Sequence, residues 1–253
     1  MATAKALQKK SRVVPAPRPA GPTRGAREEA LELIFAPLEQ GDGFRHGALG
    51  APGYGKTTHM RAVIAAALER DLVDVVVTHD TKGAQPEFDG IYLRSTSEQP
   101  DAAELEQRRH VVYRGDPHAD VDCPAEEAAM LARTIARSGQ RVLFNVGELK
   151  NCLSDGGRGW TAPSALWFSA QGRQLKGCLT WTNQQPKRCP DEIFDQSTTV
   201  AFLHHNERSA NYLSNTLMLD AEMVAILPKL GKFELVIWQP ELEWNRKVYP
   251  FPP

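Results

Sequence analysis

A glycine-rich run at residues 50–58 carries the residue types and the spacing that chemistry on a nucleotide needs. It reads Gly50-Ala-Pro-Gly-Tyr-Gly-Lys-Thr-Thr58 and matches the pattern G-x-x-x-x-G-K-[ST]. Glycine permits a positive φ and a close approach of backbone N–H groups to phosphate oxygens, and it occupies Gly50, Gly53 and Gly55. The run predicts a loop that wraps the phosphates of a nucleoside triphosphate; the alternative is an ordinary glycine-rich turn.

Three residues at the end of this loop have separate predicted tasks. Lys56 reaches the β- and γ-phosphates, and the hydroxyl group of Thr57 binds Mg²⁺. Thr58 is a second phosphate contact. The predicted cofactors are therefore ATP and Mg²⁺, with Thr57 as the metal-binding residue.

A carboxylate follows a hydrophobic run further along the chain. Residues 141–146 predict a central strand, and Gly147-Glu148 comes directly after it, where a parallel sheet places its chemistry. Glu148 is the predicted catalytic residue that polarises water; the alternative is a solvated loop carboxylate. NTPases of this kind usually carry Asp-Glu at this point, and glycine cannot hold a metal. Either Asn145, Asp80 or Glu148 itself supports Mg²⁺ through water, or hydrolysis is slow.

A row of amides follows a neighbouring predicted strand at residues 177–182. The sequence Asn183-Gln184-Gln185-Pro186 places these amides at the carboxyl edge of the sheet. Gln184 is the predicted sensor of the γ-phosphate, and a turn with satisfied hydrogen bonds is the alternative.

The elements that must position these residues alternate between strand and helix. Helical spacing of apolar residues follows the loop as far as Asp71. The chain predicts strands at residues 46–49, 74–78, 110–113, 141–146, 177–182, 198–203 and 233–238, and helices at 124–138, 162–175 and 217–227. This alternation predicts an α/β fold with a doubly wound, mostly parallel sheet of the P-loop NTPase type.

Composition divides the chain into an arm and a body. The chain has 253 residues, of which 42% are hydrophobic, which suits one α/β domain at residues 29–253. Residues 1–27 hold seven lysines and arginines and no acid, so the net charge of −1 divides into +7 there and −8 on the remainder. Residues 1–28 predict a disordered basic arm rich in alanine and proline. It contacts nucleic acid or an acidic partner, solubilises the chain, or is an organellar transit peptide.

Cysteines and hydropathy bear on the location of the protein. Reduced structural thiols are predicted because none of the four cysteines forms a C-x-x-C pair: Cys123, Cys152, Cys178 and Cys189. No apolar run approaches the roughly 20 residues that cross a bilayer. We expect a soluble protein that is not secreted.

The order of these motifs resembles one family. A phosphate loop is followed by a strand ending in Asp80-x-Lys82-Gly83, a strand ending at Glu148, then Gly172-Arg173 and Gln184-x-Pro186. Over roughly residues 45–240 this order is similar to the FtsK–HerA superfamily of DNA-pumping ATPases. Within it, the short chain looks most like the genome-packaging ATPases of tailless, internal-membrane viruses.

The resemblance implies a ring, usually a hexamer, with nucleotide at the subunit interfaces and double-stranded DNA in the central channel. It implies that Lys56 and Thr57 hold the nucleotide and Mg²⁺, that Glu148 is the catalytic carboxylate and that Gln184 is the sensor. An arginine that reaches across the interface would stabilise charge in the transition state. Arg173 is the first candidate, with Arg188 and Arg158 behind it.

For DNA, we expect contacts from residues that flank a glycine-rich stretch after Glu148, namely Lys150, Arg158 and Trp160. The alternative for Trp160 is a position in the core. The expected function is an ATP-driven double-stranded DNA translocase that packages a viral genome into a preformed capsid. Its expected partners are capsid or portal-vertex proteins, and its expected location is the host cytoplasm or the virion.

Three alternative functions remain from the sequence. The first is a cellular or conjugative DNA pump. The second is a nucleotide-gated scaffold with little turnover, because Gly147 replaces the metal-orienting acid. The third is a small-molecule kinase, which needs a lid with several arginines; Arg108, Arg109 and Arg114 lie in one stretch but form no recognisable lid.

Overall fold

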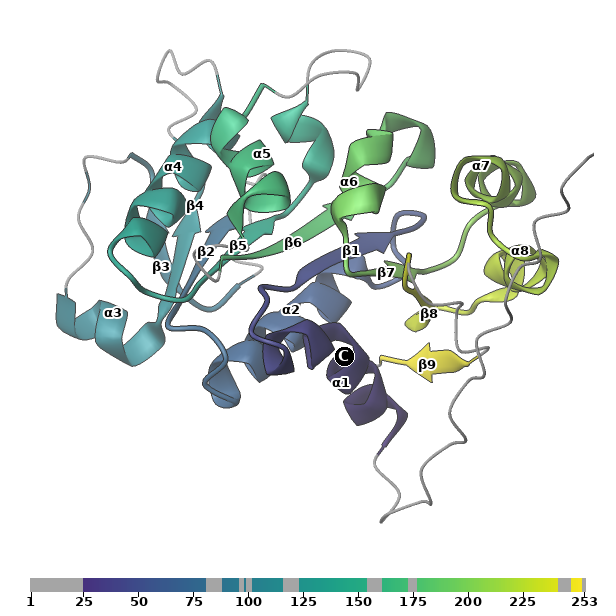
Figure 1. Cartoon of the computed structure of the whole chain (residues 1–253), viewed down its shortest axis with the longest axis horizontal. Coiled ribbons are helices and arrows are strands. Elements are labelled where there is room, and N and C mark those ends of the chain that lie inside the picture. The colour runs from purple at the N-terminus through teal and green to yellow at the C-terminus, as the bar shows by residue number, and fades with distance from the viewer. Residues whose placement is uncertain are drawn as a thin grey trace, which may run out of the picture.

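A nine-stranded sheet forms the centre of the molecule (Figure 1). The computed structural model describes residues 25–80, 88–95, 98, 102–115, 123–153, 161–172, 177–240 and 247–251. The strands follow one another across the sheet in the order β3-β4-β2-β5-β6-β1-β7-β8-β9. Their bounds are β1 Arg45–Leu49, β2 Val75–His79, β3 Ile91–Leu93, β4 His110–Tyr113, β5 Val142–Val146, β6 Cys178–Asn183, β7 Thr199–Phe202, β8 Glu234–Trp238 and β9 Val248–Pro250.

Helices cover both faces of this sheet. Figure 1 shows α4 and α5 above the sheet and α1 and α2 below it. The buried side chains accordingly form two apolar clusters, one on each face. The helices are α1 Ala26–Glu39, α2 Lys56–Glu69, α3 Ala102–Arg108, α4 Pro124–Arg137, α5 Pro163–Ala170, α6 Asp191–Gln196, α7 Glu207–Leu217 and α8 Ala221–Ile226, with 3-10 turns η1 Leu149–Cys152, η3 Pro186–Arg188 and η4 Leu227–Lys229.

The predicted doubly wound, mostly parallel sheet is confirmed. Strands β1 to β7 pair in parallel, and only β8 and β9 at one edge run antiparallel to their neighbours. Continuous apolar runs form the inner strands because a parallel strand is buried on both faces. The seven strands predicted from the sequence agree with the observed strands within one residue at each end.

Two predicted helices differ from the observed ones. Helix α5 ends at Ala170, and the predicted helix at 217–227 is the end of α7, a break and then α8 with η4. The break arises because Met218 has a φ of +53° and Asp220 caps the next helix by accepting a hydrogen bond from Met223 N at 2.7 Å. Helix α1 begins at Ala26, and residues 1–24 of the predicted arm lie outside the described residues. None of the four cysteines, all in the described part, forms a disulfide.

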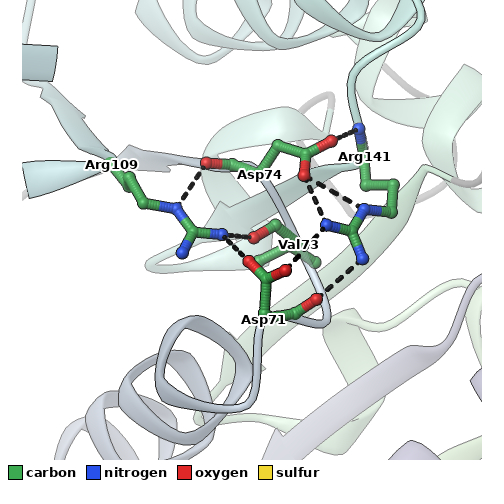
Figure 2. A network of polar contacts seen from close by, with 5 residues as sticks. All are labelled: Asp71, Val73, Asp74, Arg109 and Arg141. Atoms are coloured by element: carbon green, nitrogen blue, oxygen red, sulfur yellow. Dashed lines mark hydrogen bonds and ion pairs between the residues drawn. The ribbon is translucent and has the colours of Figure 1, made fainter. Parts of the chain in front are cut away.

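Figure 2 shows a network of polar contacts where β2, β4 and β5 begin. The Asp74 carboxylate accepts hydrogen bonds from Arg141 N at 2.7 Å and from the Arg141 guanidinium at 2.5 and 3.1 Å. These bonds hold the pKa of Asp74 below its usual value. Arg109 donates to the Asp74 carbonyl at 3.0 Å, to the Asp71 carboxylate at 2.9 Å and to the Val73 carbonyl. The network joins the chain after α2 to the starts of three strands.

A second polar feature is a row of five side chains buried inside the sheet on the face toward α2. Strand pairing places them side by side: Thr78 on β2, Asn145 on β5, Thr180 on β6, His46 on β1 and Thr199 on β7. All five have no exposed surface. We call them the polar row.

Hydrogen bonds run along the polar row. The Asn145 amide donates to Thr78 Oγ1 at 3.3 Å and accepts from Thr180 Oγ1 at 2.9 Å. His46 Nδ1 lies 2.8 Å from Thr199 Oγ1, and His46 Nε2 lies 2.8 Å from Nε2 of His59 in α2. Because buried polar groups need partners, a slip of one strand would leave several of them unpaired. The row therefore fixes strand register and ties β1 to α2.

Five buried histidines make the stability of the fold depend on pH. Burial is the largest cause that lowers the pKa of each below the ordinary 6.5, to about 3 for His59 and about 4 for three others. His46 is also well below it, because of burial and of His59. The five are His46, His59, His79, His110 and His205.

We expect the free energy of unfolding to fall as the pH is lowered from 7.5 to 5.5. Below pH 6.5 the unfolded chain binds protons that the folded chain excludes, so each histidine contributes a slope of up to about 1.4 kcal/mol per pH unit. Denaturant titrations at several pH values measure this slope, and His59→Gln should make it shallower. Stability that stays level over this range contradicts the neutral state of these histidines.

Candidate nucleotide site

The glycine-rich run forms the connection between β1 and α2. Gly53 has a φ of +80°, and Gly55, at the N-cap of α2, has a φ of +103°, which are conformations that residues with a Cβ rarely adopt. Ala51 N donates to His204 O at 2.9 Å, and Phe233 N donates to Tyr54 O at 3.1 Å. The loop is thus held in its curled form by the segments that follow β7 and precede β8.

Lys56 lies inside this curl. Its side chain is buried, and its Nζ donates to the Gly50 carbonyl at 2.8 Å and to the Ala51 carbonyl at 3.0 Å. Thr57 and Thr58 are half-buried in the first turn of α2. An ammonium group, two hydroxyl groups and the positive end of a helix therefore converge on one loop, and this set suits triphosphate and Mg²⁺.

Glu148 stands two residues beyond β5 and is largely buried. Its Oε1 lies 3.3 Å from Nζ of Lys150, which is about half exposed at the start of η1. Strand β6 alone separates β5 from β1, so Glu148 and the phosphate loop lie at the same carboxyl edge of the sheet. The structure brings these two predicted elements to one side of the molecule.

Gly147 is a glycine for steric reasons. A Cβ at this position would lie 2.7 Å from the His79 carbonyl oxygen, which is closer than real Cβ atoms come. Gly147 N donates to that same carbonyl at 3.0 Å, and the Gly147 carbonyl accepts from Thr182 Oγ1. Neither an aspartate nor an alanine fits here unless β2 and β5 move apart.

Of the residues considered as metal supports in place of an acid at 147, Asn145 belongs to the polar row and uses both ends of its amide there. Asp80 is not part of the polar row and lies beside Gly147, since its Cα is 3.8 Å from the position that a Cβ of Gly147 would take. The Asp80 carboxylate is buried and accepts from Arg114 at 3.1 and 3.2 Å. Strand β2 thus supplies a carboxylate beside the point where β5 has none.

Gln184 begins the turn after β6 and is half-buried. Asn183 pairs with Leu49, the last residue before the phosphate loop, and its side chain accepts from Gln184 N at 3.0 Å. Gln184, Ala51 and Pro52 line the same cavity of about 440 Å³. The predicted sensor therefore lies next to the loop.

The other predicted residues lie apart from this cluster or outside the description. Arg188 is exposed at the end of η3. Arg158, Trp160 and Arg173, together with Lys82 and Gly83 of the motif after β2, lie outside the described residues. Within the described part, no group of three or more histidine, cysteine, aspartate or glutamate side chains forms a metal cluster.

Sequence analysis missed three residues that line the cavity beside the loop, namely Lys187, His205 and Arg208. His205 is buried, and its Nδ1 lies 2.7 Å from the Leu203 carbonyl. The rule that singled out Gln184 applies equally to His205, because it follows β7, the other parallel neighbour of β1.

Comparisons with solved structures return viral packaging NTPases and VirB4. The DNA-packaging ATPase of Sulfolobus turreted icosahedral virus has a TM-score of 0.62 and 13% identity, over 84% of this chain and 98% of that one. The genome-packaging NTPase of Sulfolobus turreted icosahedral virus 2, solved with ATP-gammaS, has a TM-score of 0.65 and 13% identity over 83% and 98%. VirB4 of Thermoanaerobacter pseudethanolicus has a TM-score of 0.60 and 10% identity over 83% and 89%.

At these identities the likeness concerns the fold. The fold expected from the resemblance to FtsK–HerA-type P-loop ATPases is confirmed. No protein-family model matches the sequence, and no curated protein does. Among the described helices, none has the length and apolarity that crossing a membrane requires.

We expect Gly147→Ala to lower the free energy of unfolding by about 1–3 kcal/mol, because the new methyl group meets the backbone of β2. Denaturant unfolding measures the change. Gly25→Ala is the matched control, since a Cβ at Gly25 meets no atom within 4 Å. Equal stability of the two variants would show that position 147 tolerates a side chain.

Proposed function

We propose that this protein is an ATP-driven translocase of double-stranded DNA that packages a viral genome into a preformed capsid. The observation that carries the proposal is the enclosure of Lys56 in a glycine loop at the start of α2, with Glu148 at the same edge of the sheet. The likeness to a DNA-packaging ATPase over 98% of that chain supports it. The proposed setting is the host cytoplasm or the virion, with capsid or portal-vertex proteins as partners.

Binding of ATP rests on the loop. Its backbone N–H groups, supported by Gly50, Gly53 and Gly55, surround the phosphates, and Thr58 adds a hydroxyl group. Lys56 transfers its hydrogen bonds from the loop carbonyls to phosphate oxygens. The hydroxyl group of Thr57 holds Mg²⁺, which supplies positive charge to the phosphate oxygens when bound.

Hydrolysis needs an oriented water and stabilised negative charge. Glu148 orients the water and takes its proton, and Gln184 donates a hydrogen bond toward the γ-phosphate. Asp80 would support Mg²⁺ through water, because it lies beside Gly147 where the usual acid has no room. Arg173 of a neighbouring subunit completes the site in a hexameric ring.

Coupling to DNA follows from the ion pair between Glu148 and Lys150. Lys150, with Arg158 and Trp160, contacts DNA phosphates in this proposal. While DNA is absent, the ammonium group of Lys150 engages the catalytic carboxylate; when a DNA phosphate takes that ammonium group, the carboxylate is released for water. DNA therefore stimulates ATP hydrolysis.

One alternative has an observation in its favour. The likeness in fold to VirB4 is equally compatible with a conjugative or cellular DNA pump. A nucleotide-gated scaffold loses its main support, because Gly147 has a steric explanation in the strand contact with His79. The arginines of a possible kinase lid are engaged elsewhere: Arg108 pairs with Asp89, Arg109 is in the Figure 2 network and Arg114 pairs with Asp80.

We expect purified protein to hydrolyse ATP and double-stranded DNA to raise the rate several-fold. Phosphate release with and without DNA measures this, and Lys56→Ala should lower the rate about 100-fold or more, because it removes the main positive charge on the transferred phosphoryl group. ATP binding without turnover, in either the presence or the absence of DNA, would favour the scaffold.

We expect Lys150→Met to raise the ATPase rate without DNA by about two- to fivefold, since Glu148 loses a partner whose ion pair is worth up to about 1 kcal/mol. The same variant should respond less to DNA. Lys229→Met, in η4, is the control and should behave as wild type. A lower basal rate in Lys150→Met would contradict this coupling.

A further inference from the structure

The cavity beside the phosphate loop carries positive charge that no described residue neutralises. Lys187 and Arg208 line it, and neither forms an ion pair with any residue in the described ranges. Lys187 Nζ lies 5.5 Å from the centre of the Tyr212 ring. No acidic residue of the described ranges contributes to the lining. Such a lining attracts an anion.

His205, one of the residues that line this cavity, has a buried polar atom without a partner. A carbonyl oxygen only accepts, so the 2.7 Å contact with Leu203 O places the imidazole proton on Nδ1. The other nitrogen, Nε2, has no hydrogen-bond partner among the described residues, although it is buried. A buried polar atom without a partner is costly, and a ligand in the cavity that Nε2 could reach would remove that cost.

The start of α7 also lies at the cavity, with Glu207 in its first turn but outside the cavity lining. Asn206 is its N-cap and accepts from Ser209 N at 2.9 Å, so the first turn of an eleven-residue helix lies on the wall of the cavity. Helix N-termini carry a partial positive charge. The loop residues Ala51 and Pro52 form another part of the same wall, so the cavity continues directly from the phosphate loop.

We propose that this cavity is the subsite for the terminal phosphoryl group, where Lys187, His205 and Arg208 of the same chain distinguish ATP from ADP. The proposal rests on nucleotide binding at the loop. The loop holds the phosphates with Lys56 on the β- and γ-phosphates, and the far side of the γ-phosphate faces the cavity, where Lys187 and Arg208 donate charge-assisted hydrogen bonds to it.

His205 joins this contact by taking up one proton from solvent. Burial, His204 and Lys56 lower its pKa to about 4, so it is neutral before the nucleotide binds. Lys56 on α2 acts on it, and Lys187 on η3 and Arg208 on α7 line the same cavity. The negative charge of the bound triphosphate opposes these positive charges and favours the imidazolium. Nε2–H then donates to a phosphate oxygen, and Nδ1–H remains on Leu203 O.

Calorimetric titration of the full chain with ATP-gammaS and with ADP tests the subsite. Lys187→Met and Arg208→Met should each weaken ATP-gammaS binding about tenfold or more and leave ADP binding within about twofold, as the loss of a charge-assisted hydrogen bond to one phosphate predicts. Arg137→Met, an exposed change at the end of α4, is the matched control. Thermal unfolding confirms that each variant is folded.

Equal losses for both nucleotides would place these side chains on the adenosine or on the first two phosphates and overturn the proposal, as would no loss at all. If wild-type protein binds neither nucleotide, nucleotide binding at the loop fails instead, so the two failures are distinguishable.

Proton uptake tests His205 separately. Titrations at pH 7 in two buffers of different ionisation enthalpy should show net uptake of a proton with ATP-gammaS but not with ADP. His205→Gln keeps a hydrogen-bond donor that cannot titrate, so it should remove the uptake and flatten the pH dependence of ATP-gammaS affinity. Uptake that persists in this variant would exclude His205 from the subsite.

Discussion

The buried polar row supports the register of five neighbouring strands, and the positions of the candidate functional residues follow from that register. Side-chain hydrogen bonds join Thr78, Asn145 and Thr180 across β2, β5 and β6, and His46 and Thr199 across β1 and β7, while backbone pairing joins β6 to β1. Asp80, Glu148, Gln184, Gly50 and His205 lie two to six residues beyond their row partners. The same alignment therefore brings all five to one edge of the sheet.

Residues of the polar row lie close in sequence to both parts of the candidate site, the phosphate loop and Glu148. His59 lies three residues after Lys56 on α2 and meets His46 of β1 inside the core. Asn145 lies three residues before Glu148 on β5. The phosphate loop and Glu148 therefore both follow strands whose row side chains are fully buried, and these strands are joined through the backbone pairing of β1 with β6 and of β6 with β5. The network of Figure 2 holds the opposite ends of β2, β4 and β5.

Local patterns were sufficient for much of the fold. Seven strands were found to within one residue because buried parallel strands are short apolar runs, and the loop was found because its glycines and Lys56 have fixed spacing. The small helices α3 and α6 and the short strands β3 and β9 carry too few residues for a period to show. The break at Met218 depends on a single positive φ and on the cap at Asp220, neither of which alters the apolar pattern.

The sequence by itself determined the phosphate loop, the parallel α/β fold and the strand ends where Glu148 and Gln184 lie, because these depend on spacing along the chain. Only the tertiary structure decided what surrounds them. From the sequence, Gly147 was interpreted as the place of a missing metal ligand. In the structure, the His79 carbonyl approaches Gly147 so closely that no side chain has room there. His205 and Arg208 join the loop because β7 lies beside β1, and a contact between residues about 150 positions apart has no local signal.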